Sequence, residues 1–319
     1  MQTALAIIEQ PATLPALQID LGLAMDFARA SKSKATLAAY ASDWREFEMW
    51  CEDRRIPPLG ATPEAIASFI ASQAQDGKKP STLSRRLAAI RFRCKAAGLP
   101  NPSEAECVKA TMSGIRRTYG SAPSRKTAMT AELVLAAVAK PGQGLQAIRD
   151  RALLLVGFAG AFRRSELIGL DVADITETPD GVLLHIRRSK VDQEGHGRKV
   201  AIPRGQIACP VAALQAWLTA AGITEGPIFR RVQGQRAGSN RLSSRIVADI
   251  VKAAAKRLGR DVATFAGHSL RAGLITTAAR RGVPLLKITA QSGHASLDML
   301  QVYCRDEQLF DGNAVAGLL

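Results

Sequence analysis

Apolar residues recur at steps of three and four along most of the chain, which is the period of an α-helix packed on one face. Between Thr36 and Arg54 this stripe is formed by Leu37, Tyr40, Trp44, Phe47 and Trp50. Because these side chains share one helical face, we interpret them as core and not as a stacking surface. Thr62 followed by Pro63 predicts the start of another helix, since proline favours the first helical position.

In two short segments of the second half of the chain, the apolar pattern changes from that of a helix to that of a strand. Residues 181–190 and 198–203 have the composition and pattern of strands, and the residues between them, 191–197, have the composition of a turn. The sequence therefore predicts two antiparallel strands.

Helical patterns surround these strands. They begin at Thr130 and run through 148–170, and after the strands we expect helices with a Gly-rich loop at 231–240. Ser243 or Ser244 is expected to open the helix that follows this loop. The expected fold class is mainly α with a small antiparallel β-sheet.

A segment without helical periodicity predicts that the chain has two domains. Residues 119–127 lack apolar periodicity and are rich in Gly, Ser and Pro, which indicates a linker. It separates a helical module at 21–118, preceded by a tail at 1–20, from a second module at 128–319 whose C-terminal tail is 305–319.

The composition excludes several classes of protein. Hydrophobic residues make up 47% of the 319 residues, as in ordinary globular proteins, and no apolar run approaches the roughly 20 residues of a membrane helix. The N-terminus lacks the pattern of a secretory signal. The 5 cysteines contain no CxxC pair, which argues against a disulfide framework or a zinc site. We expect a cytoplasmic protein with no membrane segment, metal or cofactor.

The charge balance points to a partner. Lys and Arg number 43 against 28 Asp and Glu, which gives a net charge of +15 and a pI near 10.1. An excess of this size indicates a polyanion such as nucleic acid, although a soluble protein with a basic surface is the alternative.

One basic segment contains no acidic residue at all: Lys78, Lys79, Arg85, Arg86, Arg91, Arg93 and Lys95. Pro80 ends any preceding helix, and Ser81 fits the N-cap of the next one. Leu83, Leu87 and Ile90 mark the apolar face of that helix, so we expect the arginines to point away from it, towards phosphates. The alternative is a solvated basic helix.

A second basic segment spans residues 230–260 and has Asp249 as its one acid. We expect Arg241 and Arg245 in this segment to contact DNA. Two basic surfaces far apart in the sequence suggest that two modules hold one ligand.

Two charged motifs lie in the second module. Arg163 precedes Glu166 by three residues in a mostly apolar helical segment, and this spacing favours Arg163 over its neighbour Arg164 as the functional residue. A charge there is costly unless it is paired or faces a ligand. Lys190 ends the first predicted strand, where it can reach into a cleft. Taken singly, a surface ion pair and a surface lysine also explain these motifs.

Histidines and a tyrosine follow. His268 and Arg271 are three residues apart, so on a helix they are neighbours that can hold an oxyanion together. Gly293 and His294 precede a further predicted helix, and Tyr303 comes nine residues after His294. A structural histidine and a half-buried tyrosine are the alternatives for each motif alone.

In their joint order, these motifs resemble the tyrosine site-specific recombinases, also called the phage integrase family. Residues 36–44 and 81–90 resemble that family's helical core-binding domain, so the resemblance covers most of the chain. It implies a two-domain, C-shaped clamp around duplex DNA, made of a helical core-binding domain and an α+β catalytic domain.

The resemblance also implies a reaction. Tyr303 attacks a DNA phosphodiester to form a 3′-phosphotyrosyl link, and Lys190 protonates the leaving 5′-oxygen. The other candidates for the role of Lys190 are Arg188, Arg198 and Lys199. Neither a metal nor ATP is expected, because the phosphotyrosyl bond keeps the energy for religation.

Positively charged side chains stabilise the negative charge that develops in this reaction. The resemblance implies that Arg163 and Arg271 bind the non-bridging oxygens and stabilise the transition state. His268 and His294 hydrogen-bond the phosphate or help to move the tyrosine proton, and Glu166 orients the site. A phenol with a pKa of about 10 is a poor nucleophile at neutral pH, and nearby guanidinium groups favour its phenolate.

The expected function is site-specific recombination, with strand exchange between two sites through a Holliday junction. The expected partners are double-stranded DNA with an inverted-repeat site and further copies of the chain in a homotetramer. We expect residues 305–319 to dock on a neighbouring protomer, with coverage of their own domain as the alternative. A type IB topoisomerase-like enzyme and a non-catalytic DNA-binding protein are the competing functions.

Overall fold

The structure, a computed structural model, describes residues 31–122, 126–140, 142–187 and 197–294, together with 19–20, 22–23, 27, 189, 192, 195 and 296. The chain divides into two compact units, Met1–Pro123 and Ser124–Leu319. Within the described ranges, every helix is too short or too polar to cross a lipid bilayer.

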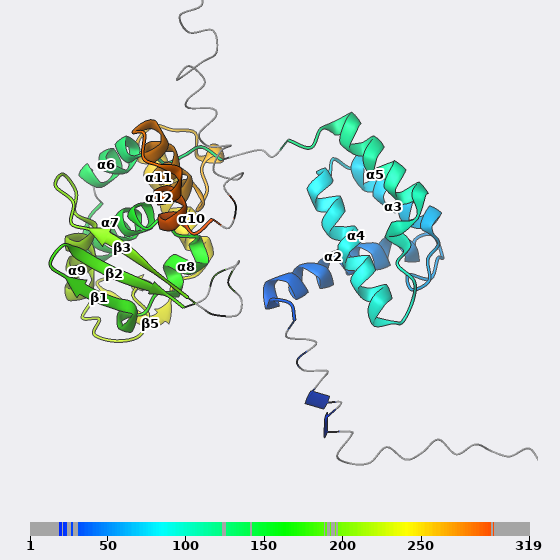
Figure 1. Ribbon diagram of the computed structural model, residues 1–319, viewed down its shortest axis with the longest axis horizontal. Helices are drawn as coiled ribbons and strands as arrows, with labels where there is room; N and C mark the ends of the chain where they lie inside the picture. Colours follow the sequence, from blue (N-terminus) through cyan, green and yellow to red (C-terminus); the bar gives the residue numbers. More distant parts are fainter. Residues whose placement is uncertain are drawn as a thin grey trace, which may run out of the picture. The chain divides into compact units, whose positions relative to one another are not determined.

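Helices form the described part of the first unit: α2 (Lys34–Glu52), α3 (Pro63–Gln75), α4 (Pro80–Ala96), the 3-10 helix η1 (Pro102–Glu104) and α5 (Glu106–Tyr119) (Figure 1). Thr62 caps α3, and Pro63 occupies its first position, as expected. Helix α4 begins earlier than expected, with Lys79 and not Ser81 at its N-cap. Pro80 explains the difference, because proline fits the first helical position and holds the residue before it in an extended conformation.

The aromatic stripe of α2 forms the core of this unit. Trp44, Phe47 and Trp50 are buried, and the ring of Phe47 lies 5.0 Å from that of Phe69 on α3, measured between centroids. Contacts of this kind stabilise a core beyond the area that they bury. The interpretation of the stripe as core is confirmed for these three residues, whereas Leu37 and Tyr40 are half-buried.

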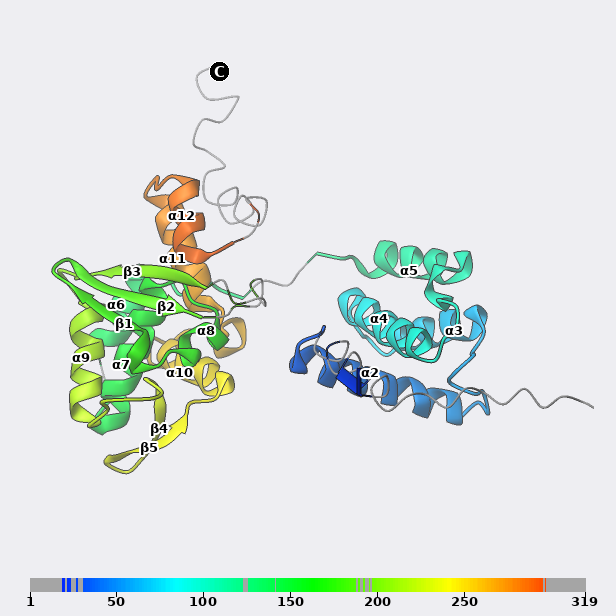
Figure 2. The same ribbon diagram turned by 60° about the horizontal axis from the view of Figure 1, so that its bottom comes forward.

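The second unit combines helices with two small sheets: α6 (Ala131–Ala139), α7 (Gly144–Ala159), α8 (Arg164–Gly169), η2 (Val172–Asp174), β1 (Ile175–Thr178), β2 (Gly181–Ile186), β3 (Arg198–Pro203), α9 (Pro210–Ala220), β4 (Arg230–Gln233), β5 (Arg236–Arg241), α10 (Ser244–Arg257), η3 (Val262–Thr264), α11 (Ser269–Arg280) and α12 (Leu285–Ser292). Helix α7 runs through its core and is buried from Ala152 to Gly157. Helix α8 lies beside the edge of the sheet at which β2 ends, at Ile186, and β3 begins, at Arg198 (Figure 2).

The larger sheet is antiparallel in the order β1-β2-β3. Strands β2 and β3 pair from Gly181 opposite Pro203 to Ile186 opposite Arg198. This confirms the two expected antiparallel strands, although β2 ends at Ile186 and does not continue into residue 187. Strand β1 was not expected, because its four residues are too few to show alternation.

Residues 231–240 are not the loop that was expected. They belong to a hairpin in which β4 and β5 pair antiparallel, with Gln233 opposite Arg236. The turn between them contains Gly234 at φ +58°. The hairpin is hard to recognise in the sequence because Val232 and Ala237 are its only half-buried apolar residues in register.

The segment that enters the second unit lies against the start of α11. Thr127 and Met129 donate backbone hydrogen bonds to the carbonyls of Thr264 and Ser269, each at 2.8 Å. Gly273 makes this approach possible, since a Cβ atom there would lie 1.8 Å from the carbonyl oxygen of Met129. The entry segment thereby helps to fix the helix that carries Arg271.

Candidate active site

Three arginines meet at the last turn of α12. The carbonyl oxygens of residues 291, 292 and 293 accept hydrogen bonds, respectively, from Arg198 at 3.0 Å, from Arg271, and from Arg163 at 3.3 Å. The final carbonyls of a helix have no partner within it and form the negative end of its dipole. One helix end thus orients guanidinium groups that arrive from β3, from α11 and from the start of α8.

Arg271 is the most deeply placed of the three. Its side chain is only 1% exposed, and Nη1 donates to the carbonyls of Ala161, at 2.9 Å, and Ser292. Nη2 lies 3.0 Å from Nε2 of His294. A buried guanidinium is costly unless it is hydrogen-bonded, and these contacts hold it in one orientation.

Arg163 and Glu166 form the expected pair, but Arg163 is the N-cap of α8 and does not lie within the helix. Its Nη1 donates to Glu166 Oε1 at 2.6 Å, and its backbone N–H donates to Oε2 at 2.9 Å. The alternative of an ion pair at the surface is wrong, because the Glu166 side chain is 1% exposed.

Arg198 is the residue that sequence reasoning placed only among the competitors of Lys190. Its Nη2 lies 3.5 Å from Oε2 of Glu166, so one carboxylate serves both Arg163 and Arg198. The signal for its role was its register: Val200 and Ile202 on the same face of β3 are buried. A basic residue on the core-facing side of a strand indicates an internal partner or a ligand.

The ring of His294 is held through both nitrogens. Arg271 donates to Nε2, so Nδ1 carries the proton and donates to Ser292 Oγ at 2.7 Å, and this hydroxyl donates in turn to the carbonyl of Ile288. Burial, followed by the charge of Arg271, lowers the pKa of His294 to about 4. The imidazole is therefore neutral at pH 7.

His268 precedes the first residue of α11 and keeps an exposed edge. Partial removal from water lowers the pKa of its imidazole, and the charges of Arg271, Arg163 and Arg164 lower it further. Five of the expected site residues are thus brought together: Arg163, Glu166, His268, Arg271 and His294. Lys190, Tyr303 and the tail at 305–319 lie outside the described residues, as does Arg188.

Arg86 requires a correction among the expected DNA contacts. It is 6% exposed, with Nη1 donating to Gln73 and Nη2 to Glu46, the latter at 3.2 Å. Arg86 follows Leu83 by three residues and therefore shares its buried face. Arg85 remains half exposed while it binds Asp43 through two hydrogen bonds, at 2.7 and 3.0 Å.

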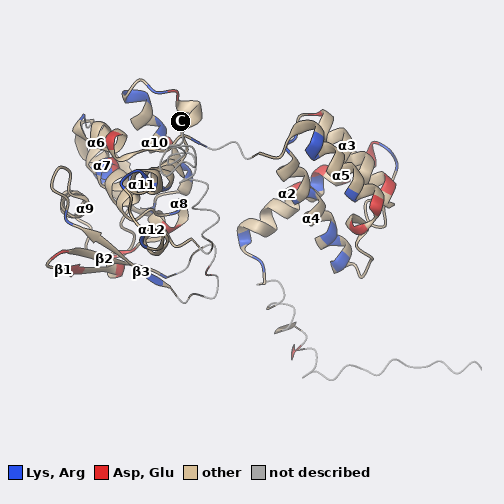
Figure 3. Ribbon diagram, turned by 45° about the horizontal axis from the view of Figure 1, so that its top comes forward, with Lys and Arg blue, Asp and Glu red and all other residues tan. Residues whose placement is uncertain are grey.

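The other expected contacts on α4 and its N-terminus are exposed: Lys78, Lys79, Arg91 and Arg93. The basic positions of α4 are blue in Figure 3. Arg245 is also exposed, in the first turn of α10.

Arg241 was also expected to contact DNA, and the structure corrects this. Its Nη1 donates to the carbonyls of Ile168, at 2.6 Å, and Leu170, and its Nη2 lies 2.5 Å from Asp171 Oδ1. Its guanidinium therefore connects β5 to the end of α8 and to the segment that follows, and it is engaged in the fold, not presented to a ligand.

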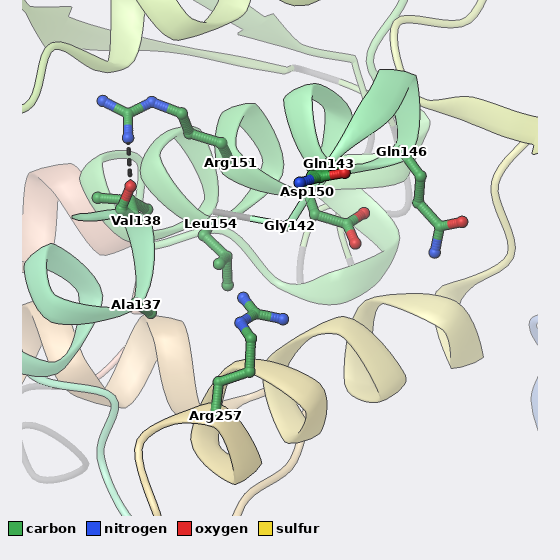
Figure 4. Close-up of a pocket in the computed structure, with 10 residues that line it drawn as sticks. Ala137, Val138, Gly142, Gln143, Gln146, Asp150, Arg151, Leu154 and Arg257 are labelled. Atoms are coloured by element: carbon green, nitrogen blue, oxygen red, sulfur yellow. Dashed lines mark hydrogen bonds between the residues drawn. The ribbon is translucent and has the colours of Figure 1, made fainter. Parts of the chain in front are cut away.

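A second polar cluster lies between α7 and the end of α10 (Figure 4). Burial raises the pKa of Asp150, and Arg149 opposes this by donating two hydrogen bonds to Asp150 Oδ1, at 2.9 and 2.7 Å. Arg151 donates to the carbonyl of Val138 at 2.5 Å. These contacts are internal to the fold and share no residue with the arginine cluster. Within the described ranges, no three His, Cys, Asp or Glu side chains gather as a metal site would require.

A helical unit followed by a mixed unit, with arginines gathered at the end of α12, is the arrangement that the resemblance to tyrosine recombinases implied. Comparison with known proteins agrees: the phage integrase family matches residues 127–309, and the N-terminal SAM-like domain of phage integrases matches residues 27–93. The chain belongs to the phage integrase family, as the resemblance implied.

One relative supports this assignment, and two solved structures share the fold. The chain is 43% identical over 298 residues to the integrase/recombinase xerD homolog of Selenomonas ruminantium, which covers 90% of this chain and 86% of the relative. XerH site-specific recombinase bound to a palindromic difH substrate has a similar structure, with a TM-score of 0.60 at 16% identity over 81% of this chain and 73% of that one. A lambda integrase tetramer bound to a Holliday junction has a TM-score of 0.58 at 19% identity over 86% of this chain and 73% of that one.

Proposed function

We propose that this protein is a site-specific DNA recombinase that cleaves and rejoins duplex DNA through a 3′-phosphotyrosyl intermediate and exchanges strands through a Holliday junction. The observation that carries the proposal is the convergence of Arg163, Arg198 and Arg271 on the end of α12 in a member of the phage integrase family. Phosphoryl transfer depends mostly on positioning and on stabilisation of charge, and fixed guanidinium groups supply both.

In the proposed reaction, the phenolic oxygen of Tyr303 attacks the phosphorus and the bond to the 5′-oxygen breaks. Arg163 and Arg271 bind the non-bridging oxygens, and Lys190 gives a proton to the leaving oxygen. Religation reverses these steps with the 5′-hydroxyl of the partner strand. The energy of the broken bond stays in the phosphotyrosine throughout.

The two histidines have different roles in this proposal. His294 has both ring nitrogens engaged, so it orients Arg271. His268 keeps an exposed edge and a lowered pKa, so its neutral imidazole is suited to accept the tyrosine proton or to hydrogen-bond the phosphate.

We further propose that the duplex is held by exposed basic residues, among them Lys78, Lys79, Arg91 and Arg93 of the first unit and Arg245 of the second. Binding should weaken steeply with salt, because each phosphate contact releases counterions. The recognition site is an inverted repeat, and the reaction takes place in the cytoplasm.

Assembly into a homotetramer would be completed by residues 305–319 of each chain, docked on a neighbour. The second unit offers an apolar groove of about 1140 Å³ between α6, the sheet and α12, lined among others by Leu135, Phe158, Leu183 and Leu274. The tail supplies matching apolar residues: Leu309, Phe310, Val315, Leu318 and Leu319. Deletion of residues 308–319 should leave binding to a single site intact and abolish the pairing of sites.

The test begins with DNA recovered from a random pool by the purified protein and sequenced for an inverted repeat. A duplex of that sequence, nicked beside the scissile phosphate, loses its short 5′-hydroxyl fragment after attack and traps the covalent adduct. Wild type should yield the adduct, and Tyr303→Phe should yield none. Absence of the adduct from wild type, or an equal yield from the variant, would overturn the proposal.

A plasmid with two sites separates recombination from its nearest competitor. Recombinant products are expected from a recombinase. Relaxation without recombinants would identify a nicking-resealing enzyme of the topoisomerase IB type instead.

A further inference from the structure

Arg198 connects elements that are distant in the sequence. It is the first residue of β3, and its Nη1 donates to the carbonyl of Gln291 in α12 at 3.0 Å, while its Nη2 approaches Glu166 of α8 at 3.5 Å. Both terminal nitrogens are thus committed to protein acceptors. The terminal nitrogens of Arg163 and Arg271 also bind protein acceptors, so the feature that distinguishes Arg198 is its contact with Gly293.

Gly293 lies against the guanidinium group of Arg198. A Cβ atom at Gly293 would lie 2.8 Å from Nε and 2.9 Å from Cζ of Arg198, so residue 293 lies directly against the guanidinium group and leaves no room for a side chain. The Nε atom is buried and has no hydrogen-bond partner in the described part of the chain. A buried donor without a partner is costly, so this close contact is maintained against a penalty.

The contact bears on the neighbouring catalytic groups. The carbonyl of Gly293 accepts from Arg163, and the next residue is His294. Glu166, which orients Arg163, is shared with Arg198. Displacement of Arg198 would therefore leave Oε2 of Glu166 with the backbone N–H of Arg163 as its remaining partner among the described residues and would remove the support from the turn at residues 293–294.

We propose that Arg198 is a positioning residue for the recombination reaction: it ties strand β3 to the Gly293–His294 turn and, through Glu166, fixes the orientation of Arg163. This inference rests on the proposed function. It assigns Arg198 neither the role of the general acid nor a direct contact with the phosphate.

The test measures single-turnover cleavage of the nicked duplex defined above, together with its dissociation constant. Arg198→Gln should lower the cleavage rate by roughly 100-fold, as a misplacement of about 1 Å does, with little change in DNA affinity. Arg198→Lys should recover only part of the rate, because an ammonium group cannot reproduce the planar fork of a guanidinium. Lys140→Gln removes an equal charge from an exposed position and should behave as wild type.

A double-mutant cycle tests the contact itself. Gly293→Ala should reproduce the loss of rate in the wild-type background and add little to Arg198→Gln, since both break one contact. Gly282→Ala is the matched control, because Gly282 has a similar φ of +69° against +65° but no neighbour within 4 Å of the added Cβ. The backbone strain that alanine introduces at residue 282 should not slow cleavage.

The outcomes separate the two proposals. If wild type forms the adduct while Arg198→Gln cleaves at the wild-type rate, or if the Gly293 and Arg198 effects add fully, the role of Arg198 is refuted and the recombinase function stands. If wild type forms no adduct, both fall. The same cycle followed by thermal unfolding needs no DNA, and independent effects there would refute the contact directly.

Discussion

Arg271 and His294 lie 3.0 Å apart, between Nη2 and Nε2, although one is a residue of α11 and the other follows α12. Burial, and after it the charge of this nearby guanidinium, lowers the pKa of the imidazole and keeps it neutral at pH 7. The histidine, in turn, fixes the guanidinium in place. Each group therefore sets the state of the other before any substrate binds.

The stability of the fold should depend on pH through His294. The pKa of His294 is about 4 in the folded protein against an ordinary value of 6.5, so between these values the unfolded chain binds more protons. This contribution to stability is present above pH 6.5 and is lost as the pH falls towards 4. His294→Gln should therefore show a flatter dependence of Tm on pH across this window, as measured by thermal unfolding. An unchanged slope would contradict the depressed pKa.

Glu166→Gln should be strongly destabilising. The substitution removes the charge that Arg163 and Arg198 share, and both arginines are largely buried. Loss of one member of a buried ion pair typically costs about 3–5 kcal/mol. Denaturant unfolding measures the change, with the exposed Glu225→Gln as a control that should have almost no effect.

Gly273→Ala should disturb the junction between the entry segment and α11. The new methyl group would lie 1.8 Å from the backbone oxygen of Met129, so backbone must shift, at a cost of roughly 3 kcal/mol. Gly114→Ala lies in α5 with nothing within 4 Å and should stabilise its helix by up to about 1 kcal/mol. Equal effects of the two substitutions on the unfolding midpoint would argue against a tight junction.

Two arginines of α4 should behave in opposite ways. Arg91 is exposed, so Arg91→Ala should weaken DNA binding with little change in stability. The slope of the logarithm of the binding constant against the logarithm of the salt concentration should become smaller by about 1. Arg86 is buried among polar partners, so Arg86→Ala should instead lower the unfolding temperature. Binding measured across a salt series and thermal unfolding separate the two effects. An unaltered salt slope for Arg91→Ala would remove that residue from the interface.

The strands and helices with strong periodicity were predictable, and the exceptions have physical causes. The β4–β5 hairpin has too few apolar residues to be recognised, and Arg86 was assigned outward because its charge concealed its position on the Leu83 face. Arg163, His268 and Arg271 were found by their spacing and order. Arg198 was not selected, because its role depends on a register with Val200 and on a contact with α12 that no local pattern contains.

The hydrogen bonds that converge on the end of α12 join residues 130, 93 and 21 positions apart. Contacts between residues so far apart require the chain between them to close into a loop, which costs conformational entropy. A nascent chain that has not yet produced α12 lacks the acceptor that the three arginines share. The arginine cluster can therefore form only in a chain that has been synthesised through α12.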